Sequence, residues 1–233
     1  MSLPVAILAG GLATRLQPIT ARIPKILVEV AGRPFAEHQL DLLQRQGIAH
    51  VVYCVGHLGE QVRDALGDGS RRGMRLEYVF DGPRLLGTGG ALRLALGRLG
   101  EAFFVLYGDS YLTCDFTAVA DAYRRSGRPG LMTVFRNEGA WDRSNVLFEK
   151  ERILRYDKRA TTPDMRYIDY GLGILSRRSL DRYAPGEVLD LATVYQDLLA
   201  RQELAGYEVP ERFYEIGSPQ GLAELRQKLE THT

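Results

Sequence analysis

The chain has 233 residues, of which 45% are hydrophobic and 25% charged, and its formal net charge is +1 at pH 7. This length and composition predict a globular protein with a sizeable core, organised as one large α/β domain or two small ones. The balanced charge excludes a general attraction to nucleic acid or to a membrane surface, so any bound anion needs a local site.

The amino-terminal run LPVAILAG is too short for a signal-peptide core and is typical of a first β-strand. No stretch approaches the roughly 20 apolar residues that a membrane span needs. The two cysteines, Cys54 and Cys114, lie in or beside apolar runs, which favours buried free thiols over a disulfide. We therefore expect a cytoplasmic protein.

The first part of the chain alternates predicted strands and helices. Strands are predicted at residues 5–8, 50–55, 76–80, 103–109 and 131–135, and helices at residues 34–47, 59–66, 91–99 and 116–125. A helix after each strand at these spacings indicates a doubly wound α/β fold with a mixed, mostly parallel sheet.

The pattern changes after about Asn137. Residues 144–159 predict a hairpin that turns at Lys150–Glu151, and further strands are predicted at residues 166–176, 204–208 and 212–216. A helix is predicted at 189–201, and Ser218 with Pro219 predicts the start of a last helix that ends near residue 230. Because no linker or repeat interrupts the chain, we expect a single domain over residues 1–233.

The segment VAILAGGLATRLQPITARIPK, residues 5–25, brings glycines and cations together after a buried strand. Gly10 and Gly11 allow a sharp turn and a close approach of the backbone to a ligand, and the amides of such a turn form an anion-binding nest. Arg15 adds a planar guanidinium and Lys25 a compact charge, both suited to phosphates. The alternative is a tight strand-to-helix turn with two solvated cations.

Two common nucleotide-binding motifs are absent from this segment. A P-loop needs G-x-x-x-x-G-K-[ST], which GGLATRL does not provide. The dinucleotide fingerprint G-x-G-x-x-G is missing, as is an acidic residue at the spacing that binds a ribose. The sequence therefore argues against a P-loop kinase and against a dehydrogenase.

Asp109 follows the predicted strand FFVLY, within the sequence LYGDS. The carboxyl ends of parallel strands form the edge at which open α/β sheets bind ligands. Asp109 is therefore placed to hold a hard cation through oxygen, although a strand-end aspartate also commonly caps a helix or forms a turn.

The run LAGGLATRLQPITARIPK resembles the signature of the sugar-1-phosphate nucleotidyltransferases, L-A-G-G-x-G-T-R-L-x-P followed by a spacer and P-K-P. Two positions depart from it, because Ala13 replaces a glycine and Ile26 replaces the proline after the lysine. Further segments are similar to family motifs in the same order along nearly the whole chain, namely LLGTGGAL, RYDKR, IDYGLGIL and FYEIGSP.

The resemblance implies a Rossmann-like (GT-A-like) fold with a nucleotide-binding core at residues 1–136 and a sugar-phosphate-binding half, with a small sugar-binding lobe, at residues 137–233. It assigns catalysis to Arg15 and Lys25, and nucleotide binding to Leu8, Gly10, Gly11, Gly87, Thr88 and Gly90. It assigns sugar-phosphate binding to Asn145, Asp157, Lys158 and Gly171, and Mg²⁺ to Asp109 and Glu215, where Glu215 replaces the usual aspartate.

The implied reaction joins a nucleoside triphosphate to a sugar 1-phosphate and releases pyrophosphate. Within the family, LYGDSY, YIDYGLGIL and YEIGSP are most similar to bacterial D-glycero-D-manno-heptose 1-phosphate guanylyltransferases, which favours GTP. Uridylyltransferases, mannose-1-phosphate guanylyltransferases and a non-catalytic nucleotide-sugar sensor remain alternatives. The expected partners are these small molecules, without nucleic acid or membrane, and a homo-oligomer is left open.

Overall fold

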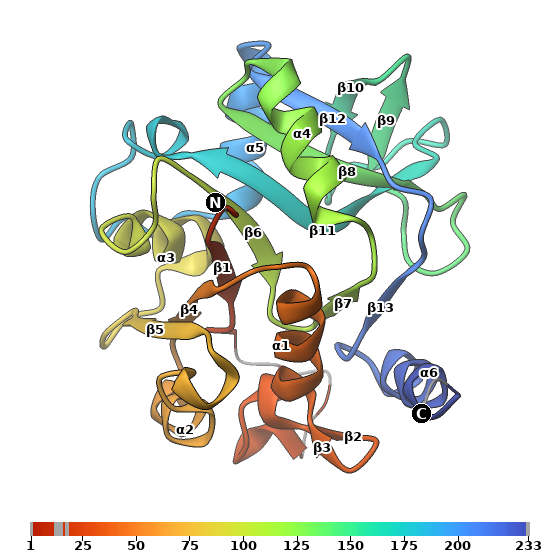
Figure 1. The fold of residues 1–233 in the computed structure, drawn as a ribbon. Coiled ribbons are helices and arrows are strands. Elements are labelled where there is room, and N and C mark those ends of the chain that lie inside the picture. Colours follow the sequence, from red (N-terminus) through yellow and green to blue (C-terminus); the bar gives the residue numbers. More distant parts are fainter. Residues whose placement is uncertain (1, 12–15, 17–18, 232–233) are drawn as a thin grey trace.

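The structure, a computed structural model, describes residues 2–11, 16 and 19–231 (Figure 1). In this part of the chain nine strands form a central sheet, and two pairs of short strands lie beside it. The central strands are β1 (Val5–Leu8), β4 (His50–Val55), β5 (Arg75–Phe80), β6 (Ala102–Tyr107), β8 (Gly130–Arg136), β9 (Val146–Glu149), β10 (Arg152–Tyr156), β11 (Tyr167–Ser176) and β12 (Leu204–Glu208).

The short strands pair as two separate antiparallel sheets. They are β2 (Glu29–Val30) with β3 (Arg33–Pro34), and β7 (Ser110–Leu112) with β13 (Phe213–Glu215). The helices are α1 (Phe35–Arg45), α2 (Gly59–Leu66), α3 (Gly87–Ala95), α4 (Phe116–Ser126), α5 (Leu191–Ala200) and α6 (Pro219–Glu230). None of the described helices is both long and apolar enough to cross a membrane.

The central sheet has the strand order β10-β9-β11-β6-β1-β4-β5, and β8 pairs with both β11 and β12 beside this path. Strand β1 is parallel to β4 and β6, and β4 is parallel to β5. Strand β11 is antiparallel to β6 and β8. The prediction of a doubly wound, mixed α/β sheet is confirmed, with β5, β4, β1 and β6 as its parallel core.

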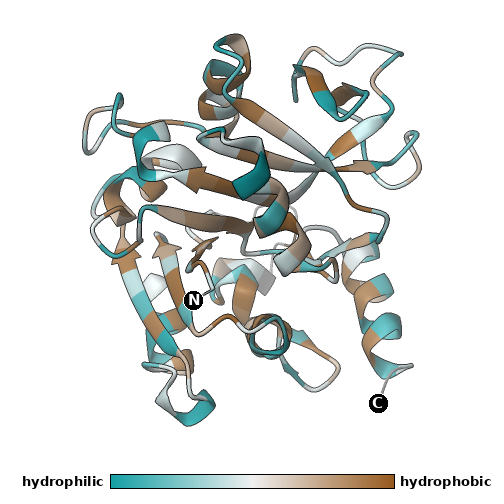
Figure 2. Ribbon diagram, turned by 45° about the horizontal axis from the view of Figure 1, so that its top comes forward, coloured by the Kyte–Doolittle hydropathy of each residue, from teal (hydrophilic) through white to brown (hydrophobic). Residues whose placement is uncertain are grey.

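Both faces of the sheet are buried, because successive side chains of each strand enter different cores. Val5 and Ile7 pack with α1, α2, α4 and α6 on one face. Ala6 packs with α3 and α5 on the other face. Strands β1 and β6 are accordingly hydrophobic along their length, whereas hydrophilic residues are frequent on the outer helices and loops (Figure 2). This arrangement leaves the ends of the parallel strands free for a ligand site.

Most predicted elements are confirmed, but the helix expected at residues 91–99 is misplaced. Helix α3 begins at Gly87, inside the glycine-rich segment, and ends at Ala95. The reason is a tertiary contact: the amides of Gly89 and Gly90 donate to the carbonyl oxygen of Leu189 at 2.8 and 3.1 Å. Sequence periodicity does not reveal such a contact. The strands β2 and β3 were not predicted, because two residues are too few to form a hydrophobic pattern.

Gly90 allows α3 to approach the segment before α5, so replacing it should destabilise the fold. A Cβ atom at Gly90 would lie 2.4 Å from the carbonyl oxygen of Glu187 and 2.9 Å from Cβ of Leu86. For Gly90→Ala we expect an overpacking cost of about 1–3 kcal/mol, reduced by up to about 1 kcal/mol of helix propensity. Urea unfolding should show the loss. Gly97→Ala, whose Cβ meets nothing within 4 Å, is the control. Equal stability of the two variants would contradict this packing.

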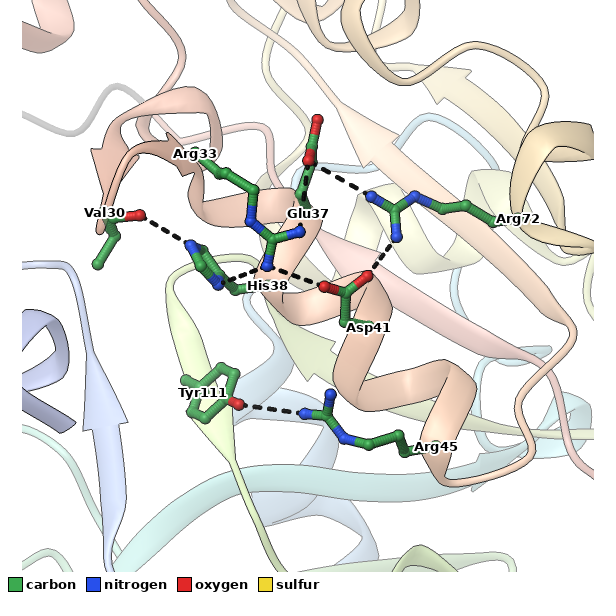
Figure 3. A network of polar contacts seen from close by, with 8 residues as sticks. All are labelled: Val30, Arg33, Glu37, His38, Asp41, Arg45, Arg72 and Tyr111. Atoms are coloured by element: carbon green, nitrogen blue, oxygen red, sulfur yellow. Dashed lines mark hydrogen bonds and ion pairs between the residues drawn. The ribbon is translucent and has the colours of Figure 1, made fainter. Parts of the chain in front are cut away.

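A polar network ties α1 to the β2–β3 hairpin and to the turn before β5 (Figure 3). The ring nitrogen Nε2 of His38 donates to the carbonyl of Val30 at 2.7 Å, and Nδ1 accepts from Arg33 at 3.1 Å. Arg33 also donates to Asp41 at 2.9 Å, and Arg72 pairs with the same carboxylate from the other side. These contacts fix α1 at one end of the sheet.

Cys54 and Cys114 are free and buried, as the sequence predicted. Burial raises the pKa of each thiol to about 12. At pH 8 about one thiol in ten thousand is then ionised, so we expect iodoacetamide to modify the folded protein far more slowly than free glutathione in the same buffer. Both thiols should react after denaturation, and rapid labelling of the folded chain would contradict the prediction.

Candidate functional site

A cavity of about 270 Å³ lies at the carboxyl ends of β1, β4, β5 and β6. This is the edge of an open α/β sheet at which ligands bind. The residues that line it are Leu8, Ala9, Gly10, Gly11, Lys25, Ile26, Cys54, Asp81, Leu85, Gly87, Thr88, Ala91, Tyr107, Gly108 and Asp109. Seven of the predicted site residues are among them, namely Leu8, Gly10, Gly11, Lys25, Gly87, Thr88 and Asp109.

The turn after β1 crosses close to the loop that follows β4. A Cβ atom at Gly10 would lie 3.1 Å from the amide nitrogen of Gly56, whereas one at Gly11 would meet nothing within 4 Å. A side chain at Gly10 would therefore need the Gly56 backbone to shift by a few tenths of an ångström, whereas Gly11 leaves open space at the cavity wall. Arg15, the other predicted cation of this segment, lies outside the described residues.

Lys25 and Asp109 meet directly at the cavity. The Nζ atom of Lys25 donates to Oδ2 of Asp109 at 2.9 Å, and the two side chains are 19% and 29% exposed. Lys25 starts the short 3-10 helix η3 (Lys25–Leu27) after Pro24. Asp109 follows Gly108, where a Cβ atom would lie 2.7 Å from the carbonyl oxygen of Leu8. The close passage of β1 and β6 thus sets where Asp109 sits.

The buried side-chain amide of Gln39 stabilises the turn that carries Asp109. Gln39 of α1 is fully buried, and its Nε2 atom donates to the carbonyl of Ser110 at 2.8 Å and to that of Tyr107 at 3.3 Å. These two carbonyls flank Gly108 and Asp109. The contact stabilises the turn without using the Asp109 carboxylate, which stays at the cavity.

Lys158 reaches the same region from the loop after β10. Its Nζ atom donates to the hydroxyl of Tyr107 at 3.2 Å and lies 3.4 Å from Oδ2 of Asp169. The same Asp169 oxygen accepts from the Tyr156 hydroxyl at 3.1 Å. Burial, with the negative charges of Asp169, Asp190 and Asp109, raises the pKa of Tyr107 well above its ordinary value, so Tyr107 is a neutral phenol.

Three other predicted sugar-site residues shape the loops around Lys158. Asn145 accepts from the amide of Asp169 at 2.9 Å through its side-chain oxygen. Asp157 accepts from the amides of Arg159 and Ala160, each at 2.8 Å, and these bonds lower its pKa. Gly171 has a φ of +95°, within a register shift of β11, so a side chain there would be strained. Their contact with a sugar stays a prediction.

The glycine-rich segment that begins α3 uses several of its polar groups for hydrogen bonds inside the protein. The Thr88 hydroxyl donates to Asp190 at 3.3 Å and accepts from the amide of Leu191 at 2.8 Å, which anchors the start of α5. Gly90 donates to Leu189, as described above, and is not among the lining residues. Gly87 lines the cavity with a φ of +73°. Base reading by these three residues remains a prediction.

Glu215 lies next to Ser110 across the β7–β13 pair, one residue from Asp109 along the neighbouring strand. Its Oε1 atom accepts from the Ser218 hydroxyl at 2.6 Å, and its Oε2 atom accepts from the amide of Gly217. Both oxygens therefore hold the start of α6. Each oxygen keeps a second lone pair, so these donors compete with a metal for the carboxylate without excluding it.

Asp109 is the residue whose surroundings best fit a divalent cation. Mg²⁺ in proteins is commonly held by one or two carboxylates, with waters and substrate phosphates completing the shell. Asp109 is partly exposed at the cavity and fits such a role. Among the described residues no group of three or more histidine, cysteine or acidic side chains forms an all-protein metal cage. The donor set therefore suits a cation that arrives with a phosphate.

Sequence analysis missed three polar residues of this region, which are Asp81, Tyr107 and Asp169. Asp81 directly follows β5 and lines the cavity, much as Asp109 comes two residues after the end of β6. The strand-end signal used for Asp109 would have found it. Tyr107 and Asp169 read as ordinary strand residues, because only the tertiary fold brings them to Lys158.

The fold and the site together define an α/β protein with a cavity at the carboxyl edge of its sheet, which is where open α/β sheets bind ligands such as nucleotides. The model of the nucleotidyl transferase family matches residues 5–143, and the chain belongs to this family.

Mannose-1-phosphate guanylyltransferase of Mycobacterium tuberculosis is 29% identical over 220 residues, which cover 92% of this chain and 61% of the relative. The chain thus spans about three fifths of the length of such curated relatives.

Two solved structures share the fold along their whole length. HddC from Yersinia pseudotuberculosis, solved with GMP-PN, has a TM-score of 0.82 at 21% identity and covers 98% of this chain and 100% of its own. The inositol-1-phosphate CTP transferase from T. maritima has a TM-score of 0.79 at 21% identity, with 97% and 96% covered. At these identities the likeness concerns the fold.

Proposed function

We propose that this chain transfers a nucleotidyl group from a nucleoside triphosphate to a sugar 1-phosphate, giving a nucleotide sugar and pyrophosphate. The observation that carries the proposal is the contact of Lys25 with Asp109, 2.9 Å apart in the lining of the cavity. A lysine beside a carboxylate that can hold a metal ion suits a bound triphosphate, because the negative charge of the phosphates must be neutralised from several sides.

The proposed chemistry is one in-line displacement at the α-phosphorus. The sugar-1-phosphate oxygen attacks, and pyrophosphate leaves on the opposite side. Because the second pKa of a phosphate monoester is near 6, the nucleophile is largely dianionic at neutral pH and needs no general base. Catalysis then depends on positioning and on charge stabilisation.

Each cation has a separate role in this reaction. Lys25 exchanges Asp109 for a phosphate oxygen of the nucleotide, and Arg15 is assigned to the same phosphates. Lys158, held over Tyr107, receives the phosphate of the sugar. Asp109, with Glu215 as a second ligand, would hold Mg²⁺, which supplies charge neutralisation at the α-phosphate and the leaving group.

The favoured substrates are GTP and D-glycero-α-D-manno-heptose 1-phosphate, for surface polysaccharide synthesis. The guanylyltransferase names of the curated relatives and the GMP-PN in HddC support a guanine nucleotide. The heptose rests on the sequence resemblance, and mannose 1-phosphate is the nearest alternative. A uridylyltransferase is a further alternative.

A second candidate is a non-catalytic nucleotide-sugar sensor in the cytoplasm. The engagement of both Glu215 oxygens at the start of α6 favours it, because these hydrogen bonds compete with a metal for the carboxylate.

The two functions separate in a test of pyrophosphate release with Mg²⁺. Each of GTP, ATP, UTP, CTP and dTTP is combined with heptose, mannose, glucose and N-acetylglucosamine 1-phosphates. We expect release with GTP and at least one sugar 1-phosphate. If a nucleotide raises the thermal stability of the chain but no pair releases pyrophosphate, the result would support the sensor and contradict the proposed transferase activity.

A further inference from the structure

Several elements hold the backbone of the turn that carries Asp109. The amide of Gly108 donates to the carbonyl of Leu8 on β1 at 2.9 Å, and the amide of Ile216, just after β13, donates to the carbonyl of Asp109 at 2.9 Å. From α1, Nε2 of Gln39 donates to the carbonyls on either side of Gly108 and Asp109, at 3.3 and 2.8 Å. Gln39 thus adds a side-chain support to a turn that is otherwise held by backbone groups.

The way in which Gln39 is buried shows that its amino group is what matters. The residue is 0% exposed, and in the part of the chain that the structure describes its Oε1 atom has no hydrogen-bond partner. A buried oxygen without a donor is costly, and an apolar side chain would fill the space without that cost. If the amide were reversed, its oxygen would face two carbonyl oxygens and repel them. The two bonds that the amino group donates therefore account for a glutamine at this position.

The position of the Asp109 carboxylate depends on this turn. The carboxylate pairs with Lys25, whose side chain is itself partly exposed. Groups that bind a metal must be held within about 0.5 Å of the working geometry, and the residues that orient them matter nearly as much as the ligands. The bond from Ile216 ties the same turn to the residue after Glu215, the other acid assigned to the metal. A shift of the turn would therefore change both the direction of the Asp109 carboxylate and its distance from Glu215.

We propose that Gln39 is a positioning residue for the divalent cation, and that it acts through the two carbonyls that flank Gly108 and Asp109. This inference rests on the proposed function, which assigns the cation to Asp109. Gln39 itself is fully buried and does not line the cavity, so it acts on the ion through the turn rather than by direct contact.

The test compares the affinity for GTP in Mn²⁺ with the affinity in EDTA, by calorimetry without a sugar phosphate. The ratio of the two affinities measures what the metal site adds and does not depend on turnover. Gln39→Met keeps a long side chain but removes both donated hydrogen bonds. We expect this variant to lower the ratio about 10-fold or more and to leave the affinity in EDTA unchanged. Asp109→Asn should lower the same ratio, which identifies the site that the ion occupies.

The matched control is Gln46→Met at the carboxyl end of the same helix. Gln46 also bonds to the backbone of a following segment, because it donates to the carbonyl of Cys114 at 3.0 Å and accepts from the amide of Phe116 at 3.2 Å. Its loss should leave the ratio unchanged. Gln39→Glu is the second variant, since it keeps the shape and can donate at most one hydrogen bond when protonated. Its ratio should lie between those of Gln39→Met and the unchanged chain, and it carries the test if Gln39→Met does not fold.

The outcomes separate this inference from the proposed function. The role of Gln39 is overturned if its variants keep the ratio of the unchanged chain, even if the chain makes nucleotide sugars. It is also overturned if Gln39→Met weakens binding equally in Mn²⁺ and in EDTA, if Gln46→Met lowers the ratio as much, or if Mn²⁺ adds nothing in the unchanged chain. A loss confined to Mn²⁺, in a chain that releases no pyrophosphate with any pair, supports the role of Gln39 and contradicts the transferase activity.

Discussion

Replacing Lys25 with methionine should lower the rate of pyrophosphate release about 100- to 1000-fold while leaving the fold intact. The side chain lies at the cavity and its described ionic partner is Asp109, so the loss is one of charge at the phosphates. Because the pair is partly exposed, it contributes at most about 1 kcal/mol to stability. Steady-state turnover and thermal unfolding of the same preparation measure both effects.

The control for this variant is Lys150→Gln, which removes an exposed lysine from the turn between β9 and β10. It should keep full activity. Lys25→Arg, which retains the charge with a different shape, should recover part of the rate. An unfolded Lys25→Met chain, or one with full activity, would show that Lys25 serves the structure rather than the phosphates.

Asp109→Asn should abolish most of the activity, with a fall in turnover of about 100-fold or more. Asparagine keeps the shape of the turn that Gln39 holds, but it removes the negative charge that would attract Mg²⁺. The Mg²⁺ concentration for half-maximal rate should rise, because the ion would then be held by the substrate phosphates with less help from the protein.

The matched control is Asp121→Asn on α4, where the carboxylate is 49% exposed and paired with Arg124. Turnover measured across a range of Mg²⁺ concentrations should be unchanged for this variant. If Asp109→Asn kept the Mg²⁺ dependence of the unchanged chain, the metal would have to bind elsewhere.

Much of the fold could be predicted from the sequence, because its elements carry strong local signals. Strand β4 and helix α2 have the bounds that their hydrophobic patterns predict, and α6 begins where Ser218 and Pro219 place it. The pairing of strands could be predicted less well. Strand β11 is antiparallel between β6 and β8, and no local pattern in Tyr167–Ser176 encodes those neighbours.

The candidate site also combines features that the sequence predicts with features that only the folded structure reveals. Lys25 and Asp109 were predicted together, one from a glycine loop and the other from a strand end, and they lie in contact. Contacts that arise from the folded chain were not predicted. Thr88 anchors α5, and Asp169 rather than Asp157 lies beside Lys158. Which partner a polar side chain selects depends on distances that only the tertiary structure sets.

The central claim is that the phosphates of a nucleotide bind where Lys25 and Asp109 meet. The most direct measurement is a crystal structure with Mn²⁺ and a GTP analogue that cannot be cleaved between the α- and β-phosphates. We predict anomalous scattering from Mn²⁺ at the Asp109 carboxylate and a phosphate oxygen within hydrogen-bond distance of Lys25. Phosphates bound outside this cavity, with Lys25 still paired to Asp109, would contradict the claim.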